Sequence, residues 1–489
     1  MIVGIDVGTT SVKGLLLDEN AQIVKTAEVP HQLFSNYPGF AEEDPEAWWK
    51  GAKAAIEMLF RGANLKAVHA IGIAGMVPAL VITRHGRPLR YSIQQNDARA
   101  VEEIMIFKRR FGDEWLFNKT GATWNQQVLP PKLLWLLKHE PDVLEQADWI
   151  CGSYEYVAFQ LTGVRYSEIN WALESGMYDF RHRAWIPELL EFLGVSQELF
   201  APIRFPYEVI GEVTNKAAQD TGLPAGTPVI AGSADHIAAA LAAGLLAPGE
   251  ALLKFGAAGD FLYVSADFAP IPELFIDFHD VPGLYVLNGC MATSGSLLRW
   301  FRDQFRLGVN FADLDREAEK ISPGADGLVV LPYFLGEKTP IHDPQARGTV
   351  LGLTLSHTPA HLYRALLEGV AYAFRHHVEV LENKGYKIER IFVADGGARS
   401  PLWRKITASV LNRPVEYLAQ SERGSCYGVA FLAGVAVRLW DIQDLSRRVV
   451  SITDPEREWA LIYQELYQIY RTTYSRLQDL YPRLRSVYA

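Results

Sequence analysis

The sequence predicts an α/β protein built from two similar units, and three observations support this fold class. The chain has 489 residues, more than the roughly 250 to 300 at which one hydrophobic core stops growing, so we expect two domains with a cleft between them. Segments rich in β-branched residues alternate with segments of helical periodicity. A glycine turn joins two apolar strands near the start of each half, in GIDVGTTSVK and in KFGAAGDF. We therefore place the boundary near residue 245, with domains at 1–245 and 246–489.

The early elements follow from local patterns. IVGIDV, VKGLLL and AQIVKTAEV predict a meander of three antiparallel strands with tight turns between them. DPEAWWKGAKAAIEMLF predicts a helix with Asp44 as N-cap and Pro45 at its first position, and AVHAIGIAG predicts a short buried strand after it. We expect further helices at about 98–110, 131–138 and 151–161.

The middle of the chain repeats the opening pattern. TPVIAGSAD predicts a strand, and HIAAALAAGLL predicts a helix whose small residues permit close packing. GEALLKF and GDFLYVSADF then predict two strands around the turn Gly256-Ala257-Ala258. Two such hairpins that face each other across a cleft could bind one phosphate chain from both sides.

Composition and charge exclude several classes of protein. Hydrophobic residues make up 49% and charged residues 21%, which is typical of a folded chain. The balance of 47 basic and 57 acidic residues gives a formal charge of -10, which argues against a surface for nucleic acid or anionic membranes. Neither a secretory signal pattern nor a long apolar span is present, and the three widely spaced cysteines are typical of reduced thiols. We expect a cytoplasmic enzyme without nucleic-acid or membrane partners.

The first glycine turn carries the groups of a phosphate cradle. Gly8 lets backbone approach an anion, and the residues after it supply hydroxyl, amide and ammonium donors: Thr9, Thr10, Ser11 and Lys13. Asp6 would repel a phosphate unless a metal lay between them, so we interpret it as reaching a hydrated Mg²⁺. The stretch matches neither the P-loop nor the dinucleotide-binding pattern, and the alternative is a polar turn with an incidental lysine.

Asp235 stands where an apolar strand meets the small-residue helix. It could cap that helix, which is the usual role of Asp at such a junction. It could also take the proton from a substrate hydroxyl that attacks a γ-phosphate. A further strand ends at Asp395 and continues into Gly396-Gly397-Ala398, where a flat ring could lie against backbone, although helix packing would also use these glycines.

Together these motifs resemble the FGGY family of carbohydrate kinases, which phosphorylate sugars and polyols with ATP. The resemblance runs through nearly the whole chain and is carried by GIDVGTTSVK, SIQQNDARA, AGSADHIAAALAAG, SGSLLRWFRD, the stretch from LPYFLGEKTP to LEGVAYAFRH, and DGGARSPLWRKI. It implies two ribonuclease H-like domains of the actin and hexokinase type with an interdomain cleft, the sugar mainly in the first domain and ATP mainly in the second.

The resemblance also implies roles for individual residues. Asp235 matches the general base, and Asp6 with Asp235 matches the Mg²⁺ site, through water. The implied contacts to ATP and its phosphates are Thr9, Thr10, Ser11, Lys13, Gly256, Ala257, Gly295, Gly396, Gly397 and Ala398. The residues expected on the substrate side are Met76, Val77, Asp97, Trp124, Asp235 and His236.

At two places the sequence departs from the family pattern, and these departures affect the predicted contacts to the phosphates and to the sugar. Family members usually have threonine after the glycine of the second turn, where this chain has Ala257, so one hydrogen-bond donor to the phosphates is missing. Xylulose kinases carry Gln-Met-His where this chain has Met76, Val77 and Pro78, so a ring of polar contacts becomes apolar. His236, where the family often has Asn or Gln, could supply a replacement donor.

Each substrate-side residue also has a purely structural interpretation. Met76, Val77 and Trp124 could be core residues, and Asp97 could form an internal ion pair with Arg99. His236 could be a buried histidine with satisfied hydrogen bonds.

The sequence thus predicts an ATP-dependent and Mg²⁺-dependent kinase for a small sugar, most simply a ketopentose such as xylulose or ribulose. Kinases for glycerol, erythritol or another polyol or modified sugar are the alternatives within the class. From other classes, the alternatives are a nucleotide-driven machine of the actin or chaperone ATPase kind, and a regulator that binds nucleotide and sugar with weak or lost catalysis. The assembly is left open, with a homodimer as one candidate.

Overall fold

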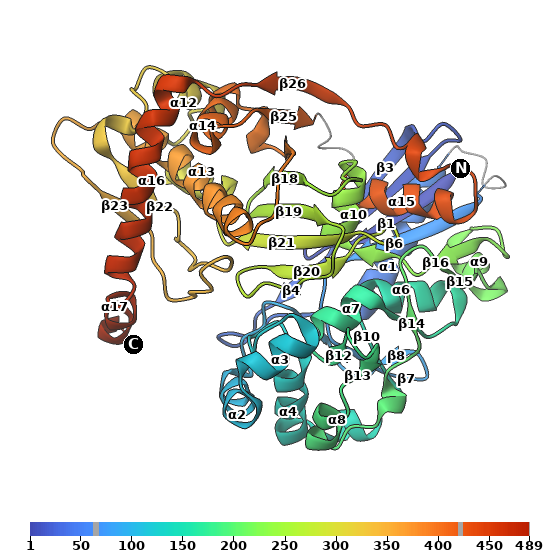
Figure 1. Cartoon of the computed structure of the whole chain (residues 1–489). Helices are drawn as coiled ribbons and strands as arrows, with labels where there is room; N and C mark the ends of the chain where they lie inside the picture. Colours follow the sequence, from blue (N-terminus) through green and yellow to red (C-terminus); the bar gives the residue numbers. More distant parts are fainter. Residues whose placement is uncertain (62–67, 419–423, 489) are drawn as a thin grey trace. The chain divides into compact units, whose positions relative to one another are not determined.

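A computed structural model describes residues 1–61, 68–418 and 424–488 of the chain, which divides into two compact units (Figure 1). The first unit comprises Met1–Gly244, Ile276–Tyr285 and Glu422–Ser446. The second comprises Leu245–Phe275, Val286–Ser421 and Arg447–Ala489. The single boundary near residue 245 stays our proposal, and two later segments pack with the first unit.

The first unit is built on a sheet with the strand order β15-β16-β6-β1-β2-β3, in which β17 also pairs with β6. Strands β1, β2 and β3 are antiparallel neighbours, which confirms the predicted meander, whereas β6, β16 and β17 extend the sheet in parallel. The strands are β1 (Ile2–Val7), β2 (Ser11–Leu17), β3 (Ile23–Pro30), β6 (Ala70–Gly75), β15 (Val209–Glu212), β16 (Pro228–Ile230) and β17 (Ser233–Ala234).

Four helices pack against this sheet or against one another: α1 (Pro45–Phe60), α6 (Ser153–Thr162), α10 (Asp235–Ala242) and α15 (Ser425–Ala436). Helix α1 begins as predicted, because Asp44 Oδ1 accepts a hydrogen bond of 2.9 Å from the amide of Glu46 and Pro45 occupies the first turn. Its apolar face is buried and includes Trp48. Burying that face supplies the hydrophobic free energy that holds the helix on the strands.

Helices α10 and α15 approach each other closely through small residues. A Cβ added to Gly428 of α15 would lie 1.9 Å from the carbonyl oxygen of Ala238 on α10, so only glycine permits this contact. The close packing that the alanine-rich sequence predicts is therefore present, and it fixes the position of the first residue of α10, Asp235.

The first unit contains further strands and helices. They are β4 (Leu33–Phe34), β5 (Glu42–Glu43), β7 (Val81–Arg84), β8 (Arg87–Pro88), β9 (Ser92–Ile93), β10 (Trp149–Cys151), β11 (Ser167–Glu168), β12 (Tyr178–Asp179), β13 (Ala184–Trp185), β14 (Ile203–Arg204), α2 (Val101–Phe111), α3 (Asp113–Thr120), α4 (Leu129–His139), α5 (Pro141–Glu145), α7 (Ile169–Glu174), α8 (Pro187–Leu193) and α9 (Asn215–Thr221). The helices expected at about 98–110, 131–138 and 151–161 correspond to α2, α4 and α6, with ends within a few residues of the prediction.

The second unit repeats the pairing pattern of the first. Its sheet includes the order β21-β19-β18-β24-β25-β26, in which β18 pairs antiparallel with β19 and parallel with β24. In the first unit β1 pairs antiparallel with β2 and parallel with β6 in the same way. This repetition confirms that the two glycine-turn hairpins belong to equivalent units.

The elements of the second unit are β18 (Glu250–Phe255), β19 (Gly259–Ser265), β21 (Tyr285–Met291), β22 (Val329–Leu331), β23 (Thr349–Leu351), β24 (Arg390–Ala394), β25 (Val415–Leu418), β26 (Val449–Thr453), α11 (Gly295–Phe305), α12 (Phe311–Ala318), α13 (Pro359–Asn383), α14 (Pro401–Leu411), α16 (Arg457–Leu477) and α17 (Tyr481–Tyr488). Helix α13 is buried over most of its length and carries the ion pair of Arg364 with Glu368, at 2.7 Å, inside the core. Strand β20 (Phe275–Phe278) is divided between the units: Phe275 belongs to the second, and the rest of the strand belongs to the first.

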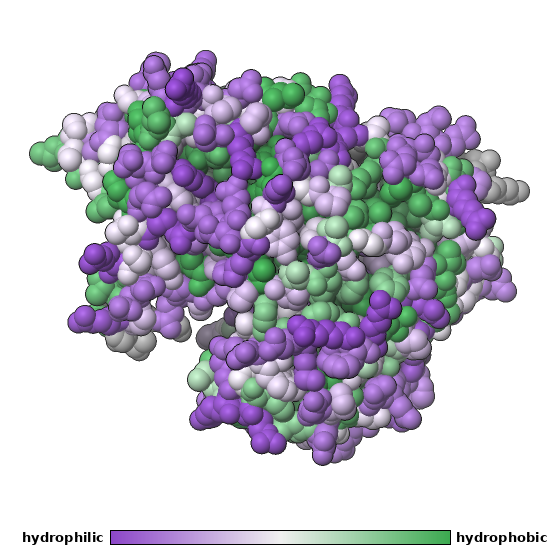
Figure 2. All heavy atoms as spheres, viewed as in Figure 1, coloured by the Kyte–Doolittle hydropathy of each residue, from purple (hydrophilic) through white to green (hydrophobic). Residues whose placement is uncertain are grey.

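Polar side chains cover much of the face seen in Figure 2, with smaller hydrophobic areas between them. Among the described residues, no helix combines the length and the apolar character needed to cross a bilayer. Cys151, Cys290 and Cys426 are free thiols, as predicted.

Candidate functional site

The ends of three parallel strands bring the predicted catalytic residues of the first unit to one edge of its sheet. Asp6 of β1 and Ser233 of β17 both pair with Ala74 of β6, from its two sides. Because neighbouring strands are about 4.8 Å apart, the backbones of Asp6 and Ser233 lie roughly 10 Å from each other. Asp235 follows two residues after Ser233. Ligands of α/β proteins bind at this carboxyl edge, so the topology places two carboxylates where a substrate would lie.

The first hairpin presents its polar groups around Gly8. The Gly8 amide donates to the carbonyl of Ser11 at 3.1 Å, which closes the turn. Thr9, Thr10 and Lys13 are exposed, so their donors can meet a ligand. The Ser11 hydroxyl instead donates to Glu28 at 2.8 Å, so a protein carboxylate already uses the donor that we predicted for phosphate.

Asp6 is buried at the end of β1, opposite Lys13 in the strand register. Its Oδ2 accepts a hydrogen bond of 2.7 Å from the hydroxyl of Ser425, at the start of α15. This contact holds the carboxylate in one orientation. Sequence reasoning missed Ser425, because it follows Asp6 by more than 400 residues and carries no motif of its own.

Asp235 is the first residue of α10 and does not cap it. Ala234 occupies the N-cap position, and the helix has no side-chain cap. The Asp235 side chain is 42% exposed, and its Oδ1 accepts a hydrogen bond of 2.6 Å from the amide of His236. The carboxylate is thus held by one oxygen while it remains open to solvent, which suits a base that must reach a substrate.

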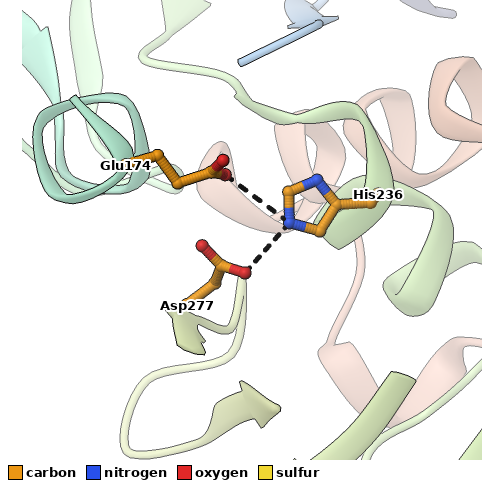
Figure 3. Close-up of side chains that lie close together, drawn as sticks. All are labelled: Glu174, His236 and Asp277. Carbon is orange, nitrogen blue, oxygen red and sulfur yellow. Dashed lines mark hydrogen bonds and ion pairs between the residues drawn. The ribbon is translucent and has the colours of Figure 1, made fainter. Parts of the chain in front are cut away.

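His236 lies between three carboxylates. Its Nε2 is 3.0 Å from Asp277 Oδ2 and 3.8 Å from Glu174 Oε1, and its Nδ1 is 3.4 Å from Asp235 Oδ1. Figure 3 shows Glu174 and Asp277 reaching Nε2 from two separate elements, helix α7 and strand β20. Sequence reasoning found His236 through its neighbour Asp235 but missed the other two, which lie at least 40 residues away along the chain.

The electrostatics of this cluster follow from burial and from its charges. Burial alone lowers the pKa of His236, but the charge of Asp277 and the hydrogen bonds to Asp235 and Asp277 outweigh it and raise that pKa well above its usual range. Burial and the charge of Asp277 raise the pKa of Glu174 well above its usual range. The imidazolium form of His236 is therefore stabilised mainly by the charge of Asp277.

The other substrate-side residues are buried. Met76 and Val77 follow β6 at the carboxyl edge of the sheet and are almost fully enclosed. Trp124 packs against Phe107, with ring centroids 4.7 Å apart, and donates its indole N–H to the carbonyl of Gly112 at 2.9 Å. Each has the contacts of a core residue, and its contact with a substrate stays a prediction.

Asp97 forms the internal ion pair that the sequence allowed. It is 1% exposed, and its Oδ2 lies 2.8 Å from Nη2 of Arg99. The same carboxylate accepts the amide of Ala41 at 2.6 Å, and the Arg99 guanidinium lies 3.9 Å from the ring centroid of Phe40. Asp97 therefore stabilises the fold through its contacts with Arg99 and Ala41, and its contact with a sugar stays a prediction.

A cavity of about 600 Å³ lies within the second unit and gathers five of the residues predicted to contact ATP: Gly256, Ala257, Gly295, Gly396 and Gly397. Its volume falls in the range of small-molecule sites, roughly 300 to 1,000 Å³. Its walls include the rings of Phe255, Phe311, Tyr363 and Trp403. Backbone at the glycines and aromatic rings on the walls suit a flat purine ring.

Gly295 shows why glycine is needed in this cavity. Its amide donates to the carbonyl of Gly256 at 2.8 Å, and a Cβ at Gly295 would lie 2.7 Å from that same oxygen. The start of α11 is thereby joined to the turn between β18 and β19. Ala398, by contrast, is buried and does not line the cavity.

Several wall residues were not predicted from the sequence. Arg299, Asp315, Tyr363 and Trp403 line the cavity from four different helices. Asp315 accepts a hydrogen bond of 3.0 Å from the Tyr363 hydroxyl, and burial raises its pKa. None of these residues lies in a glycine turn, so a search for phosphate-cradle patterns does not find them.

The residues expected to hold Mg²⁺ fit its chemistry. Asp6 and Asp235 supply carboxylate oxygens at one sheet edge, and Mg²⁺ prefers such oxygens together with water. The Ser425 hydroxyl orients one of these carboxylates and the His236 amide orients the other.

Comparison with known proteins identifies a family for both parts of the chain. The N-terminal domain of the FGGY family of carbohydrate kinases matches residues 1–242, and the C-terminal domain of that family matches residues 268–437.

Individual relatives are similar over the full length. The xylulose kinase of Escherichia coli (strain K12) is 30% identical over 98% of this chain and 100% of its own. The crystal structure of xylulose kinase from Rhodospirillum rubrum is 42% identical, with a TM-score of 0.93 over 98% of this chain and 99% of its own. The crystal structure of gluconate kinase from Lactobacillus acidophilus is 26% identical, with a TM-score of 0.92 over 99% of both chains.

Proposed function

The chain belongs to the FGGY family of carbohydrate kinases, and from this premise we propose that it transfers the γ-phosphoryl group of ATP to a ketopentose, with xylulose as the first candidate substrate. The two-domain sugar kinase fold predicted from the sequence is confirmed. Relatives that are named xylulose kinase and match nearly the whole chain support the choice of sugar.

One observation supports the chemistry most directly. The parallel strands β1, β6 and β17 bring Asp6, Met76 and Asp235 to the same sheet edge, and Asp235 is exposed there. Phosphoryl transfer requires little covalent chemistry from the protein, so a positioned base and charge stabilisation account for most of the catalysis.

In the proposed reaction Asp235 accepts the proton of the substrate hydroxyl. The alkoxide oxygen then bonds to the γ-phosphorus, the bond from that phosphorus to the β-phosphate oxygen breaks, and ADP leaves. Lys13 and the amides of the Gly8 turn offset the negative charge of the transferring group. Mg²⁺, when bound near Asp6 and Asp235, would neutralise charge on the ATP oxygens.

The cavity of the second unit is the proposed adenosine site. Gly396 and Gly397 would let the purine lie against backbone, and Trp403 would form a wall beside it. The backbone amides of Gly256 and Ala257 would bind phosphate oxygens in place of the threonine hydroxyl that family members usually supply. We therefore expect weaker ATP binding and not loss of activity.

ADP release with Mg-ATP across a panel of ketopentoses, aldoses, polyols and sugar acids tests this proposal. We expect xylulose or ribulose to give the highest kcat/KM. Asp235→Asn should lower kcat by about 10²- to 10⁴-fold, which is the usual contribution of a positioned general base. A panel in which no compound raises turnover above background would contradict the kinase proposal, and so would full activity in the Asp235 variant.

The same panel separates the alternatives. Preference for glycerol or erythritol would indicate a polyol kinase, and sugar binding without turnover would indicate a regulator. The cytoplasmic location and the homodimer expected from the sequence stay predictions.

A further inference from the structure

We propose that His236 is a positioning residue for Asp235: it holds the Oδ1 atom of that carboxylate, so that Oδ2 is the atom that accepts the substrate proton. This inference rests on the proposed function and concerns the same reaction. In this proposal His236 does not contact the sugar directly. It affects the reaction by holding Asp235, the base.

Two groups of His236, the backbone amide and the ring nitrogen Nδ1, lie close to the same oxygen of Asp235. The backbone amide of His236 lies 2.6 Å from Asp235 Oδ1, and the ring Nδ1 lies 3.4 Å from it. Within the described part of the chain, no hydrogen-bond partner engages Oδ2 of this carboxylate, which is 42% exposed. The two oxygens of the base are therefore unequal: one is anchored and the other is available.

The imidazole ring is itself held from its other side. Nε2 faces Asp277 Oδ2 at 3.0 Å and Glu174 Oε1 at 3.8 Å (Figure 3). Carboxylates accept hydrogen bonds, so a ring nitrogen that faces one must donate. Nε2 is thereby anchored on Asp277, and this contact keeps the ring in place with Nδ1 facing Oδ1 of Asp235.

The elements that carry Glu174 and Asp277 are joined by two hydrogen bonds within the first unit. The side chain of Asn170 on α7 donates from Nδ2 to the carbonyl of Phe278 at 2.9 Å and accepts at Oδ1 from the Phe278 backbone amide at 2.7 Å. This pair of bonds joins α7, which carries Glu174, to β20, which carries Asp277. These two hydrogen bonds set the distance between Glu174 and Asp277. They therefore set the position of the His236 ring between those two side chains.

Burial limits what His236 can offer a substrate. Its side chain is 14% exposed, and each ring nitrogen already faces a carboxylate. The donor that the sequence suggested for the sugar is thus occupied by the protein. During the reaction the proton moves from the substrate oxygen to Asp235 Oδ2, and His236 gains and loses no proton.

Steady-state kinetics of His236→Asn and Asp277→Asn, with the sugar that turns over fastest in the panel, test the proposal. Both variants should lower kcat about 10- to 100-fold, because misplacing a reacting group by about 1 Å costs up to 10²-fold. The KM for the sugar and the KM for ATP should stay within about threefold of the original. Imidazole added to His236→Ala should restore part of the lost kcat.

His182→Asn is the matched control, since His182 also pairs with a carboxylate, Asp179 at 2.8 Å, and it is 77% exposed. This control should retain full kcat.

Several outcomes would overturn the proposal while the unaltered enzyme remains active, so they differ from failure of the proposed function. One is an unchanged kcat in both variants. Another is a raised sugar KM at constant kcat, which would show a direct substrate contact. A third is a fall in kcat that matches the loss of folded protein measured by circular dichroism.

Discussion

Lys132 of α4 is a buried cation without a carboxylate partner among the described residues. Its side chain is 1% exposed, and its ammonium donates to the carbonyl of Gln94 at 2.8 Å. Burial lowers its pKa to about 7, against a smaller opposing effect of Asp97. The folded protein therefore holds Lys132 partly neutral at physiological pH, whereas the unfolded chain holds it fully charged.

This difference predicts how stability changes with pH. Between pH 7 and about 10 the unfolded chain binds a proton that the folded chain has released, so Lys132 makes stability rise with pH, by up to about 1.4 kcal/mol per unit. Lys132→Met removes that dependence. We expect the urea midpoint of the variant, relative to the original, to be highest near pH 7 and to fall as pH rises to 9.5.

Urea titrations at pH 7, 8 and 9.5 measure this difference, and Lys138→Met, which removes an ammonium that is 41% exposed, is the control. A constant difference between variant and original across this range would show that Lys132 stays charged in the folded protein.

At the same scale, the sequence identified residues that lie beside a glycine turn or a strand end, such as Asp6, Lys13 and Asp235. It could not identify Glu174 and Asp277, because these meet His236 only after α7 and β20 have folded against each other. Likewise, Met76 is buried against partners distant in sequence, such as Ser153, whose hydroxyl donates to the Met76 carbonyl at 3.1 Å.

In the first unit, the paired helices α10 and α15 determine the positions of the two carboxylates at the sheet edge, Asp235 and Asp6. Helix α10 carries Asp235 at its first position, and α15 carries Ser425, whose hydroxyl orients Asp6. The contact of Gly428 with the backbone of α10 sets the distance between these helices. The periodicity and small residues predicted α10 itself, but its partner could not be found, since no local pattern links two segments almost 190 residues apart.

Gly428→Ala should therefore destabilise the first unit. The new Cβ would lie 1.9 Å from the carbonyl oxygen of Ala238, so one helix must shift. Overpacking of this kind costs about 1 to 3 kcal/mol. Differential scanning fluorimetry should show a lower midpoint, and kcat should fall because Asp235 moves with α10.

Gly424→Ala, at the N-cap of the same helix, is the control variant, since a Cβ there meets no described atom within 4 Å. Equal midpoints for the two alanine variants would argue against close packing as the reason for glycine at residue 428.

At the scale of the whole molecule, the two units divide the chemistry. The proposed base and its positioning residue belong to the first unit, and the cavity proposed for adenosine belongs to the second. Length and the repeated hairpin predicted two units from the sequence, and the resemblance to the kinase family implied the sugar in the first unit and ATP in the second. The exact membership of Ile276–Tyr285 and Glu422–Ser446 could not be predicted, because both segments are surrounded in sequence by residues of the second unit.

Because the proposed adenosine site and the proposed base lie in different units, we expect substitutions in the cavity to affect the binding of ATP and not the binding of the sugar. A Cβ at Gly396 meets no described atom within 4 Å, so a phenylalanine ring there can occupy the cavity without straining the backbone. Gly396→Phe should raise the KM for ATP at least 10-fold and leave the melting temperature unchanged. Asp235→Asn should bind ADP as the original does in isothermal titration calorimetry.

Gly396→Ala provides the size control and should bind ADP normally. An ATP KM that is insensitive to Gly396→Phe would place the adenosine elsewhere.

The position of α15 has a consequence for how the chain is made. This helix (orange-red in Figure 1) covers strands of the first unit, and a Cβ at Gly4 would lie 2.1 Å from the carbonyl oxygen of Cys426. The ribosome must add about 180 residues after Gly244 before α15 exists, which takes roughly 10 to 40 s at 5 to 20 residues per second. Throughout that interval the nascent first unit leaves an apolar face of its sheet uncovered, so chaperones have a defined period in which to bind it.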